Sequence, residues 1–211
     1  MSTLFMSPKG GNCTTVTTAA FALTSALRGT PTVLFDLCGD APAVLGLTEP
    51  SSPGINDWLS ENGEGTAESL VKLGTPLHNG LVVVHRGSRF VDGQPRWQQF
   101  AEAVSSLPQN VVIDAGTTFV PEEVREAVQT ITMVTRACYL SLRRATHLPK
   151  PHNVVVIKEE ARALTVNDVG HVLGVPLFAE IPYNPAISRA VDAGLLPSRC
   201  EQLFSHHFPE E

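Results

Sequence analysis

Short apolar runs alternate with longer segments of helical period along the chain, and this alternation constrains the fold more than any other feature. Several runs are unbroken stretches of Val, Ile, Leu and Phe, as expected for strands whose two faces are both covered by helices. The predicted strands are residues 3–7, 32–36, 81–85, 110–114, 131–135, 153–157 and 175–181. Strands that alternate with helices through short connections predict an α/β fold. It is a doubly wound, mostly parallel sheet of about seven strands with helices on both faces.

The segments between these strands carry apolar residues at helical spacing. The predicted helices are residues 15–27, 55–60, 67–73, 95–107, 121–130, 138–145, 166–173 and 184–193. Near the C-terminus, Cys200, Leu203 and Phe204 fall near one helical face and indicate a further helix that packs against the rest of the chain. A chain of 211 residues is long enough for one substantial core, so we expect a single α/β domain over residues 1–211.

The charge balance argues against two classes of partner. The chain has a net charge of -6 and only four lysines, whereas binding along a nucleic-acid backbone needs a broad basic surface, so nucleic acid is not an expected partner. No apolar run approaches the roughly 20 residues that span a bilayer, and no basic and apolar leader opens the chain, so we expect a cytoplasmic protein without membrane insertion. Four scattered cysteines without a CxxC pair indicate neither a zinc site nor a disulfide framework.

The segment after the first predicted strand, "SPKGGNCTTVTTAAFAL" from Ser7 to Leu23, has the form of a phosphate-binding loop. In such loops, glycines let backbone N–H groups turn toward phosphates at a helix N-terminus, a lysine reaches the phosphates, and a hydroxyl holds Mg²⁺. Ligands of a doubly wound sheet bind beyond the carboxyl ends of its strands. The residues directly after the strands are therefore the site candidates, namely 9–15, 36–40, 114–117 and Arg136.

The loop resembles the variant motif K-G-G-x-G-K-[ST] of the ParA/MinD family of ATPases. Lys9 matches the signature lysine of that motif, Gly10 and Gly11 match its glycines, and Thr15 matches the magnesium-binding hydroxyl. In the family, the signature lysine reaches across a dimer interface to the nucleotide of the partner subunit. The resemblance therefore gives Lys9 a role in dimerisation as well as in nucleotide binding.

Two adjacent positions depart from that motif, because Cys13 stands where the family has glycine and Thr14 where it has the phosphate lysine. Loss of the lysine removes a charge-assisted contact of about 1.5 to 3 kcal/mol, which is about 10- to 150-fold in affinity. A Cβ at position 13 costs about 1 to 2 kcal/mol if the loop needs a left-handed residue there. The loop either keeps that strain or relaxes to another shape.

Further segments follow the family in the same order. "TVLFDLCGDAPAVLGLTEPSSPGINDWL" resembles its second strand and the following loop, and Asp36 matches an aspartate assigned to magnesium and water positioning. The family often has a second acidic residue two positions later, where this chain has Cys38, with Asp40 displaced by two more. "NVVIDAGTT" resembles the strand whose terminal aspartate, here Asp114, supports Mg²⁺ through water. With the late segments "MVTRACYLSLRRA" and "GVPLFAEIPYNPAISRAVDAGLL", the resemblance covers about residues 4–196.

The resemblance implies a homodimeric, nucleotide-dependent switch that positions or organises a protein partner, with ATP and Mg²⁺ as ligands and slow or absent hydrolysis. The residues it assigns to ATP are Lys9, Gly10, Gly11, Asn12, Cys13, Thr14 and Thr15. It assigns Mg²⁺ to Thr15, Asp36 and Asp114, and catalysis to Asp36 and Lys9.

Other interpretations stand beside this one. A nucleotide-free pseudo-ATPase that acts as a dimeric interaction module is the alternative, and a kinase or synthetase on the same fold is the least supported, because the phosphate lysine matters most for chemistry. Strand-end aspartates also cap helices and initiate turns, and this role is favoured for Asp40. After "VVVIKEE" the chain lacks the asparagine that family members often use to read adenine. The C-terminal segment lacks the basic flank of a MinD-type membrane anchor.

Overall fold

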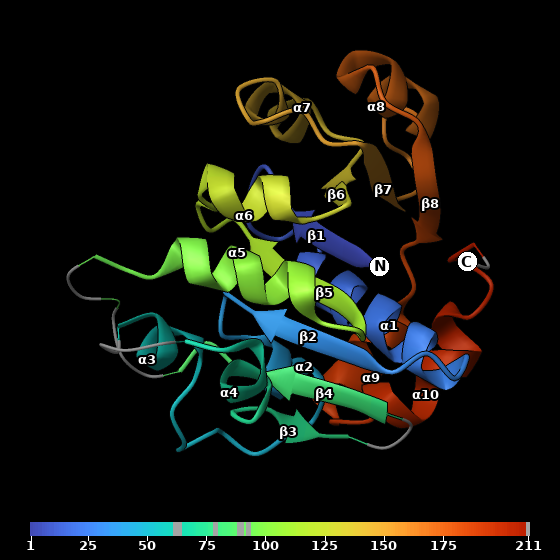
Figure 1. The fold of residues 1–211 in the computed structure, drawn as a ribbon. Coiled ribbons are helices and arrows are strands. Elements are labelled where there is room, and N and C mark those ends of the chain that lie inside the picture. Colours follow the sequence, from blue (N-terminus) through green and yellow to red (C-terminus); the bar gives the residue numbers. More distant parts are fainter. Residues whose placement is uncertain (61–64, 78–79, 88–90, 92–93, 210–211) are drawn as a thin grey trace.

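An eight-stranded sheet organises the computed structural model, which describes residues 1–60, 65–77, 80–87, 91 and 94–209 (Figure 1). The strands are β1 (Ser2–Met6), β2 (Thr32–Asp36), β3 (Thr75–Pro76), β4 (Leu81–Val84), β5 (Asn110–Gly116), β6 (Thr130–Arg136), β7 (Asn153–Lys158) and β8 (Leu177–Pro182). Their order is β3-β4-β2-β5-β1-β6-β7-β8, and every neighbouring pair is parallel except β3 and β4. The predicted doubly wound α/β class is confirmed.

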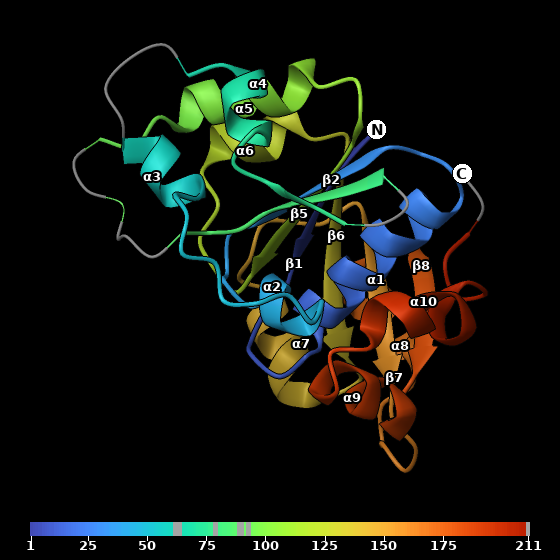
Figure 2. The same ribbon diagram turned by 90° about the horizontal axis from the view of Figure 1, so that it is seen from below.

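Helices cover both faces of this sheet, and Figure 2 shows α4, α5 and α6 on one side with α1 and α10 on the other. The helices are α1 (Thr14–Leu27), α2 (Ala41–Val44), α3 (Ile55–Ser60), α4 (Ala67–Val71), α5 (Trp97–Ser106), α6 (Glu122–Ala127), α7 (Tyr139–Ala145), α8 (Val166–Leu173), α9 (Pro185–Asp192) and α10 (Leu196–Phe204).

Side chains along each strand alternate between two apolar cores. Leu4 and Phe35 lie in one core, where the Phe35 ring meets Phe100 of α5 with the ring centroids 5.4 Å apart. Phe5 points to the opposite core and meets Phe21 of α1 at 5.2 Å. Because both faces of the sheet are buried, its strands need apolar residues at every position, which explains the unbroken runs in the sequence.

The C-terminal segment packs against the rest of the chain, as predicted, and the structure places α10 on α1. Cys200 of α10 is fully buried there. Beyond α10, the guanidinium of Arg28 donates hydrogen bonds to the carbonyl oxygens of Ser205, Phe208 and Pro209 at 3.1, 3.0 and 2.7 Å. These bonds join the C-terminal end of α1 to the last described residues.

The short elements differ from the sequence expectations. β3 is an eighth strand that the apolar pattern does not predict, because its two residues are exposed. The helix predicted over residues 121–130 ends at Ala127, because Thr130 begins β6 beside Thr3 of β1. Within the described ranges, no helix is long and apolar enough to cross a bilayer.

Candidate functional site

The carboxyl ends of the central strands open into a cavity of about 830 Å³. β1 lies between β5 and β6, and β2 lies on the far side of β5, so the segments that follow these four strands are neighbours. The predicted loop residues all line the cavity: Lys9, Gly10, Gly11, Asn12, Cys13, Thr14 and Thr15. Cys38, Asp40 and Arg136 line it too. Asp36 and Asp114 lie fully buried at the adjoining strand ends.

Hydrogen bonds hold the loop after β1 in shape. The Ser7 amide donates to the Gly116 carbonyl oxygen at 2.6 Å, and the Ser7 hydroxyl donates to the Lys9 carbonyl oxygen at 2.9 Å. The buried Asn12 side chain donates to the hydroxyl oxygens of Ser7 at 3.0 Å and Ser141 at 3.1 Å. Asn12 therefore joins the loop to α7, a connection that sequence reasoning missed.

Cys13 keeps the left-handed backbone conformation that the motif gives to glycine. Its φ and ψ are 62° and 30°, and its carbonyl oxygen accepts the first helical hydrogen bond from the Thr17 amide at 2.9 Å. Of the two outcomes left open by the sequence, the loop thus keeps its shape and bears about 1 to 2 kcal/mol of strain. The first amides of α1, which have no partner within the helix, start next to the cavity and give it an anion-binding character.

Of the two lysine positions of the motif, this chain keeps a lysine only at position 9 and has threonine at position 14. Thr14 is buried at the first turn of α1 and carries no charge. Lys9 is half-buried, and its ammonium donates to the Gly10 carbonyl oxygen at 2.8 Å. Within the described part of the chain, no carboxylate lies within ion-pair distance of Lys9. The Lys9 ammonium therefore remains able to exchange its bond for one to an anion.

Arg136 brings a second cation to the loop from the end of β6. Its guanidinium donates to Cys13 Sγ at 3.4 Å and to Glu159 Oε1 at 2.6 Å. Glu159 also accepts from Arg162 Nε at 2.6 Å, so one carboxylate is shared by two guanidinium groups and this trio keeps a positive charge. The sequence placed Arg136 among the strand-end candidates but gave it no role.

The two strand-end aspartates lie side by side, because Asp36 of β2 and Asp114 of β5 are register partners. Asp36 accepts three backbone amides, those of Cys38 at 2.9 Å, Gly39 at 2.8 Å and Ala41 at 3.0 Å. This carboxylate therefore stabilises the turn into α2. Asp40 occupies the N-cap position of α2, but its side chain makes no capping bond.

The carboxyl group of Asp114 accepts fewer backbone hydrogen bonds than that of Asp36. One of its oxygens accepts the Gly116 amide at 3.1 Å, and the Thr15 side chain contacts the same carboxyl. Its Oδ2 is buried and has no hydrogen-bond partner among the described residues. Burial raises the pKa of Asp114 to about 7, and the negative charge of Asp36 adds to this effect. Burial also raises the pKa of Asp36, although its three amide bonds oppose the change.

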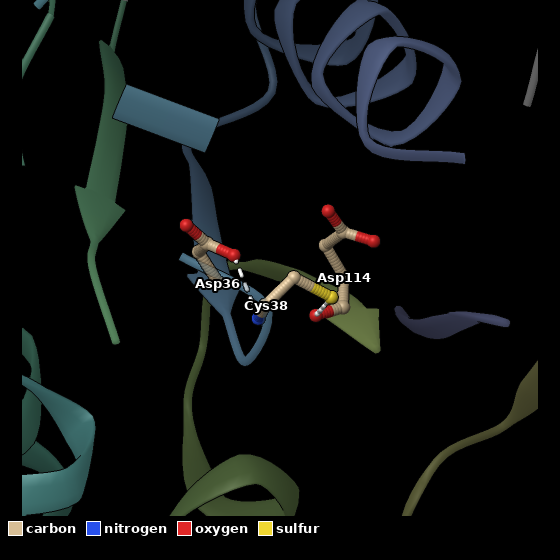
Figure 3. Close-up of side chains that lie close together, drawn as sticks. All are labelled: Asp36, Cys38 and Asp114. Atoms are coloured by element: carbon tan, nitrogen blue, oxygen red, sulfur yellow. Dashed lines mark hydrogen bonds between the residues drawn. The ribbon is translucent and has the colours of Figure 1, made fainter. Parts of the chain in front are cut away.

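Cys38 completes this group of side chains (Figure 3). Its Sγ and one oxygen of each aspartate all lie within 4.8 Å of one another. The thiol lies against Gly116, where a Cβ would come within 2.5 Å of Sγ, so a side chain at that position of β5 would displace the thiol. Burial and the charges of Asp114 and Asp36 raise the pKa of the Cys38 thiol.

The residues around the cavity partly fit the two ligands that the family motif implies, a divalent cation and a nucleotide phosphate. The orphaned oxygen of Asp114, whose carboxyl the Thr15 side chain contacts, fits a divalent cation. Phosphate groups would find the amides at the start of α1 together with Lys9 and Arg136. Thr14 contributes no charge to either ligand.

Comparisons with known proteins agree with this arrangement. No protein-family model and no curated protein matches the sequence. Among solved structures, the septum site-determining protein MinD from Pyrococcus horikoshii OT3, complexed with Mg-ADP, matches with a TM-score of 0.75 and 16% identity, over 99% of this chain and 93% of that chain. A ParA family ATPase from Chlorobium tepidum TLS matches with a TM-score of 0.75 and 18% identity, over 98% and 95%. A chain of the MinC:MinD cell division protein complex from Aquifex aeolicus matches with a TM-score of 0.73 and 15% identity, over 100% and 98%.

These likenesses extend over nearly the whole of each chain. This chain also has a mostly parallel sheet with a glycine loop between β1 and α1. At sequence identities of 15% to 18%, a structural match establishes the fold alone. The chain has the ParA/MinD-like fold of P-loop ATPases.

Proposed function

We propose that the protein is a nucleotide-dependent dimeric switch, which binds an adenine nucleotide with Mg²⁺, hydrolyses it slowly or not at all, and positions a protein partner. The observation that carries the proposal is the shape of the loop after β1. Cys13 is held in a strained left-handed conformation, and Arg136 is placed against it. An unused loop gains nothing from that strain, whereas a loop that must present its amides to phosphate depends on it.

Arg136 supplies the charge that Thr14 cannot. A guanidinium bound to phosphate makes charge-assisted, often bidentate hydrogen bonds. From its place beside Cys13, the Arg136 guanidinium needs only to exchange a weak contact to sulfur for a stronger contact to a phosphate oxygen. The bond from Arg136 to Glu159 uses the other terminal nitrogen of the guanidinium and does not have to break.

Slow hydrolysis follows from the same contacts. Phosphoryl transfer depends on cations placed where charge develops on the transferred group. Lys9 comes from the loop and Arg136 from β6, and Thr14 leaves the start of α1 without an ammonium. This arrangement favours retention of a nucleotide over its turnover.

The face around the loop supports dimerisation. Phe119 and Tyr139, which follow β5 and β6 on either side of β1, expose 82% and 74% of their surface. A second copy of the chain on this face would cover both side chains and bring Lys9 to the partner's nucleotide. The Aquifex relative is solved in a complex with MinC, and by analogy a protein partner is proposed here as well.

Titration of Mg·ATP during thermal unfolding tests nucleotide binding. The wild-type melting temperature should rise with ligand concentration, by about 2.7 kcal/mol of stabilisation at 100 times Kd. Arg136→Gln should weaken binding about 10- to 150-fold, because it removes one charge-assisted contact. Arg144→Gln on α7 is the matched control, since Arg144 is exposed and does not line the cavity. Absence of any shift at millimolar nucleotide in the wild type would overturn the proposal.

The alternative is a nucleotide-free dimeric interaction module, and the uncharged Thr14 favours it. Thr14→Lys in the Arg136→Gln background separates the two interpretations. If the loop binds nucleotide, the added lysine should restore the affinity lost with Arg136. If the loop serves only as a structural turn, neither substitution will change the response to nucleotide.

A further inference from the structure

Two carboxylates and a thiol meet at the ends of β2 and β5. Asp36 and Asp114 are both fully buried, and within the described part of the chain no lysine or arginine lies within ion-pair distance of either. Cys38 reaches them from the turn after β2, and it lines the cavity through which a ligand would enter.

Buried carboxylates side by side are unfavourable unless a proton or a cation compensates them. The backbone amides around Asp36 compensate that side chain. Asp114 Oδ2 is buried and receives no such bond, and one oxygen of the same carboxyl lies within 4.8 Å of Cys38 Sγ and of an Asp36 oxygen. A carboxyl that lies beside a thiol and a second carboxylate, and that keeps one oxygen unpartnered, therefore points to a missing cation.

We propose that Asp36, Cys38 and Asp114 directly bind one divalent cation that favours sulfur, of the Zn²⁺ or Co²⁺ type, in preference to Mg²⁺. Thiolate is a ligand for borderline and soft metals, whereas Mg²⁺ takes oxygen ligands only. This binding requires no nucleotide, so the inference stands independently of the proposed switch.

The geometry is close to what such an ion requires. In a tetrahedral zinc site, with Zn–S of about 2.3 Å and Zn–O of about 2.1 Å, neighbouring donor atoms lie about 3.6 Å apart. The three donor atoms lie within 4.8 Å of one another, so small rotations of the side chains bring them to that spacing around one ion. The Cys38 thiol now contacts the Asp114 carbonyl oxygen at 3.6 Å. On binding, its S–H bond breaks, the proton goes to solvent, and the thiolate electron pair forms the bond to the metal. Three protein ligands leave one position for water or an anion in the cavity.

Cysteine spacing alone could not indicate this site. Cys38 and Asp114 are 76 residues apart, and the ligands come from two strands that only the sheet brings together. The absence of a CxxC pair therefore excludes a common form of zinc site but not this one.

Titration of Co²⁺ into chelator-stripped protein without nucleotide tests the inference. We expect a single saturable site, with a near-ultraviolet thiolate-to-cobalt charge-transfer band and visible bands of a low-symmetry cobalt ion. Zn²⁺ should displace the cobalt stoichiometrically, and Mg²⁺ in large excess should not. Cys38→Ser should abolish the thiolate band. It should also weaken cobalt binding by at least about 10- to 100-fold, because loss of a residue that merely hydrogen-bonds a metal ligand already has an effect of that size.

Cys138→Ser is the matched control, because Cys138 is a half-buried thiol at the start of α7 that has no part in the cluster. Its cobalt spectrum should equal that of the wild type. Circular dichroism establishes that Cys38→Ser is folded, and X-ray absorption of the zinc-loaded wild type provides a second test, since sulfur must appear in the first shell. A missing thiolate band, a band that persists in Cys38→Ser, or displacement by Mg²⁺ would overturn the inference. None of these results depends on whether Mg·ATP stabilises the protein.

Discussion

Cys13 holds a backbone conformation that glycine adopts without strain, at the point where the loop becomes α1. Glycine would give the same turn at a lower energy. It would not provide the sulfur atom that accepts a hydrogen bond from Arg136. The side chain thus exchanges local stability for a fixed position of the guanidinium beside the loop.

Cys13→Gly should raise the free energy of unfolding by about 1 kcal/mol. Relief of about 1 to 2 kcal/mol of left-handed strain outweighs about 0.5 to 1 kcal/mol of extra chain entropy in the unfolded state. Urea unfolding measures the difference. Cys13→Ala is the control, because it removes the sulfur and keeps the Cβ, and it should give no such gain. A glycine variant less stable than the alanine variant would contradict the strain argument.

At the scale of elements, one histidine joins the end of β4 to the segment that begins α3. His85 Nδ1 accepts the Gly87 amide at 3.0 Å, and its Nε2 lies 3.1 Å from the Ser52 hydroxyl. The His85 carbonyl oxygen accepts the Ile55 amide at 2.9 Å. Because Nδ1 accepts a hydrogen bond, the ring is neutral with its proton on Nε2.

This arrangement predicts a loss of stability in mild acid. Burial lowers the pKa of His85 below 6.5, although Asp36, Asp57 and Glu49 oppose the change. The unfolded chain therefore takes up a proton near pH 6.5 while the folded protein does not. The contribution of His85 to stability is fully present above that pH and is lost as the pH drops toward the folded pKa. Asp114, whose pKa burial raises to about 7, contributes in the opposite direction over this range.

His85→Gln should make the slope of the unfolding free energy against pH less positive between about pH 5 and 7, because it removes the His85 contribution. Urea unfolding at several pH values measures the slope. His147→Gln, a substitution of an exposed histidine after α7, should leave the slope unchanged. An identical slope in wild type and His85→Gln would assign the acid sensitivity to other groups.

At the scale of the whole molecule, the sequence predicts the sheet because buried parallel strands require unbroken apolar runs, as in β5 and β7. It does not predict β3 or, from periodicity, the four-residue α2, because elements so short contain no period. The loop and its aspartates could be located by motif, but the partners of Cys13 could not. Arg136 is 123 residues away from it and meets it only because β6 lies beside β1.

The position of Lys9 leads to a prediction about dimerisation of the whole molecule. Mg·ATP should convert monomer to dimer, measured by light scattering after gel filtration, because the Lys9 ammonium can exchange its bond to Gly10 for one to the partner's phosphate. Lys9→Ala should abolish this conversion and retain nucleotide binding by the monomer. Lys150→Ala, which removes an exposed lysine remote from the cavity, should dimerise normally. Dimerisation of Lys9→Ala equal to that of the wild type would exclude this role.

The strand order also separates charge across the cavity. Asp36, Cys38 and Asp114 lie on the side of β2 and β5, whereas Arg136 ends β6 and Arg162 follows β7, with the loop between the two groups. A ligand with a positive and a negative end meets opposite potentials at the two sides, and the reversed orientation places like charges together. The order of strands in the sheet thus gives the site a direction, which would orient a metal–phosphate pair before any contact with the rest of the ligand is made.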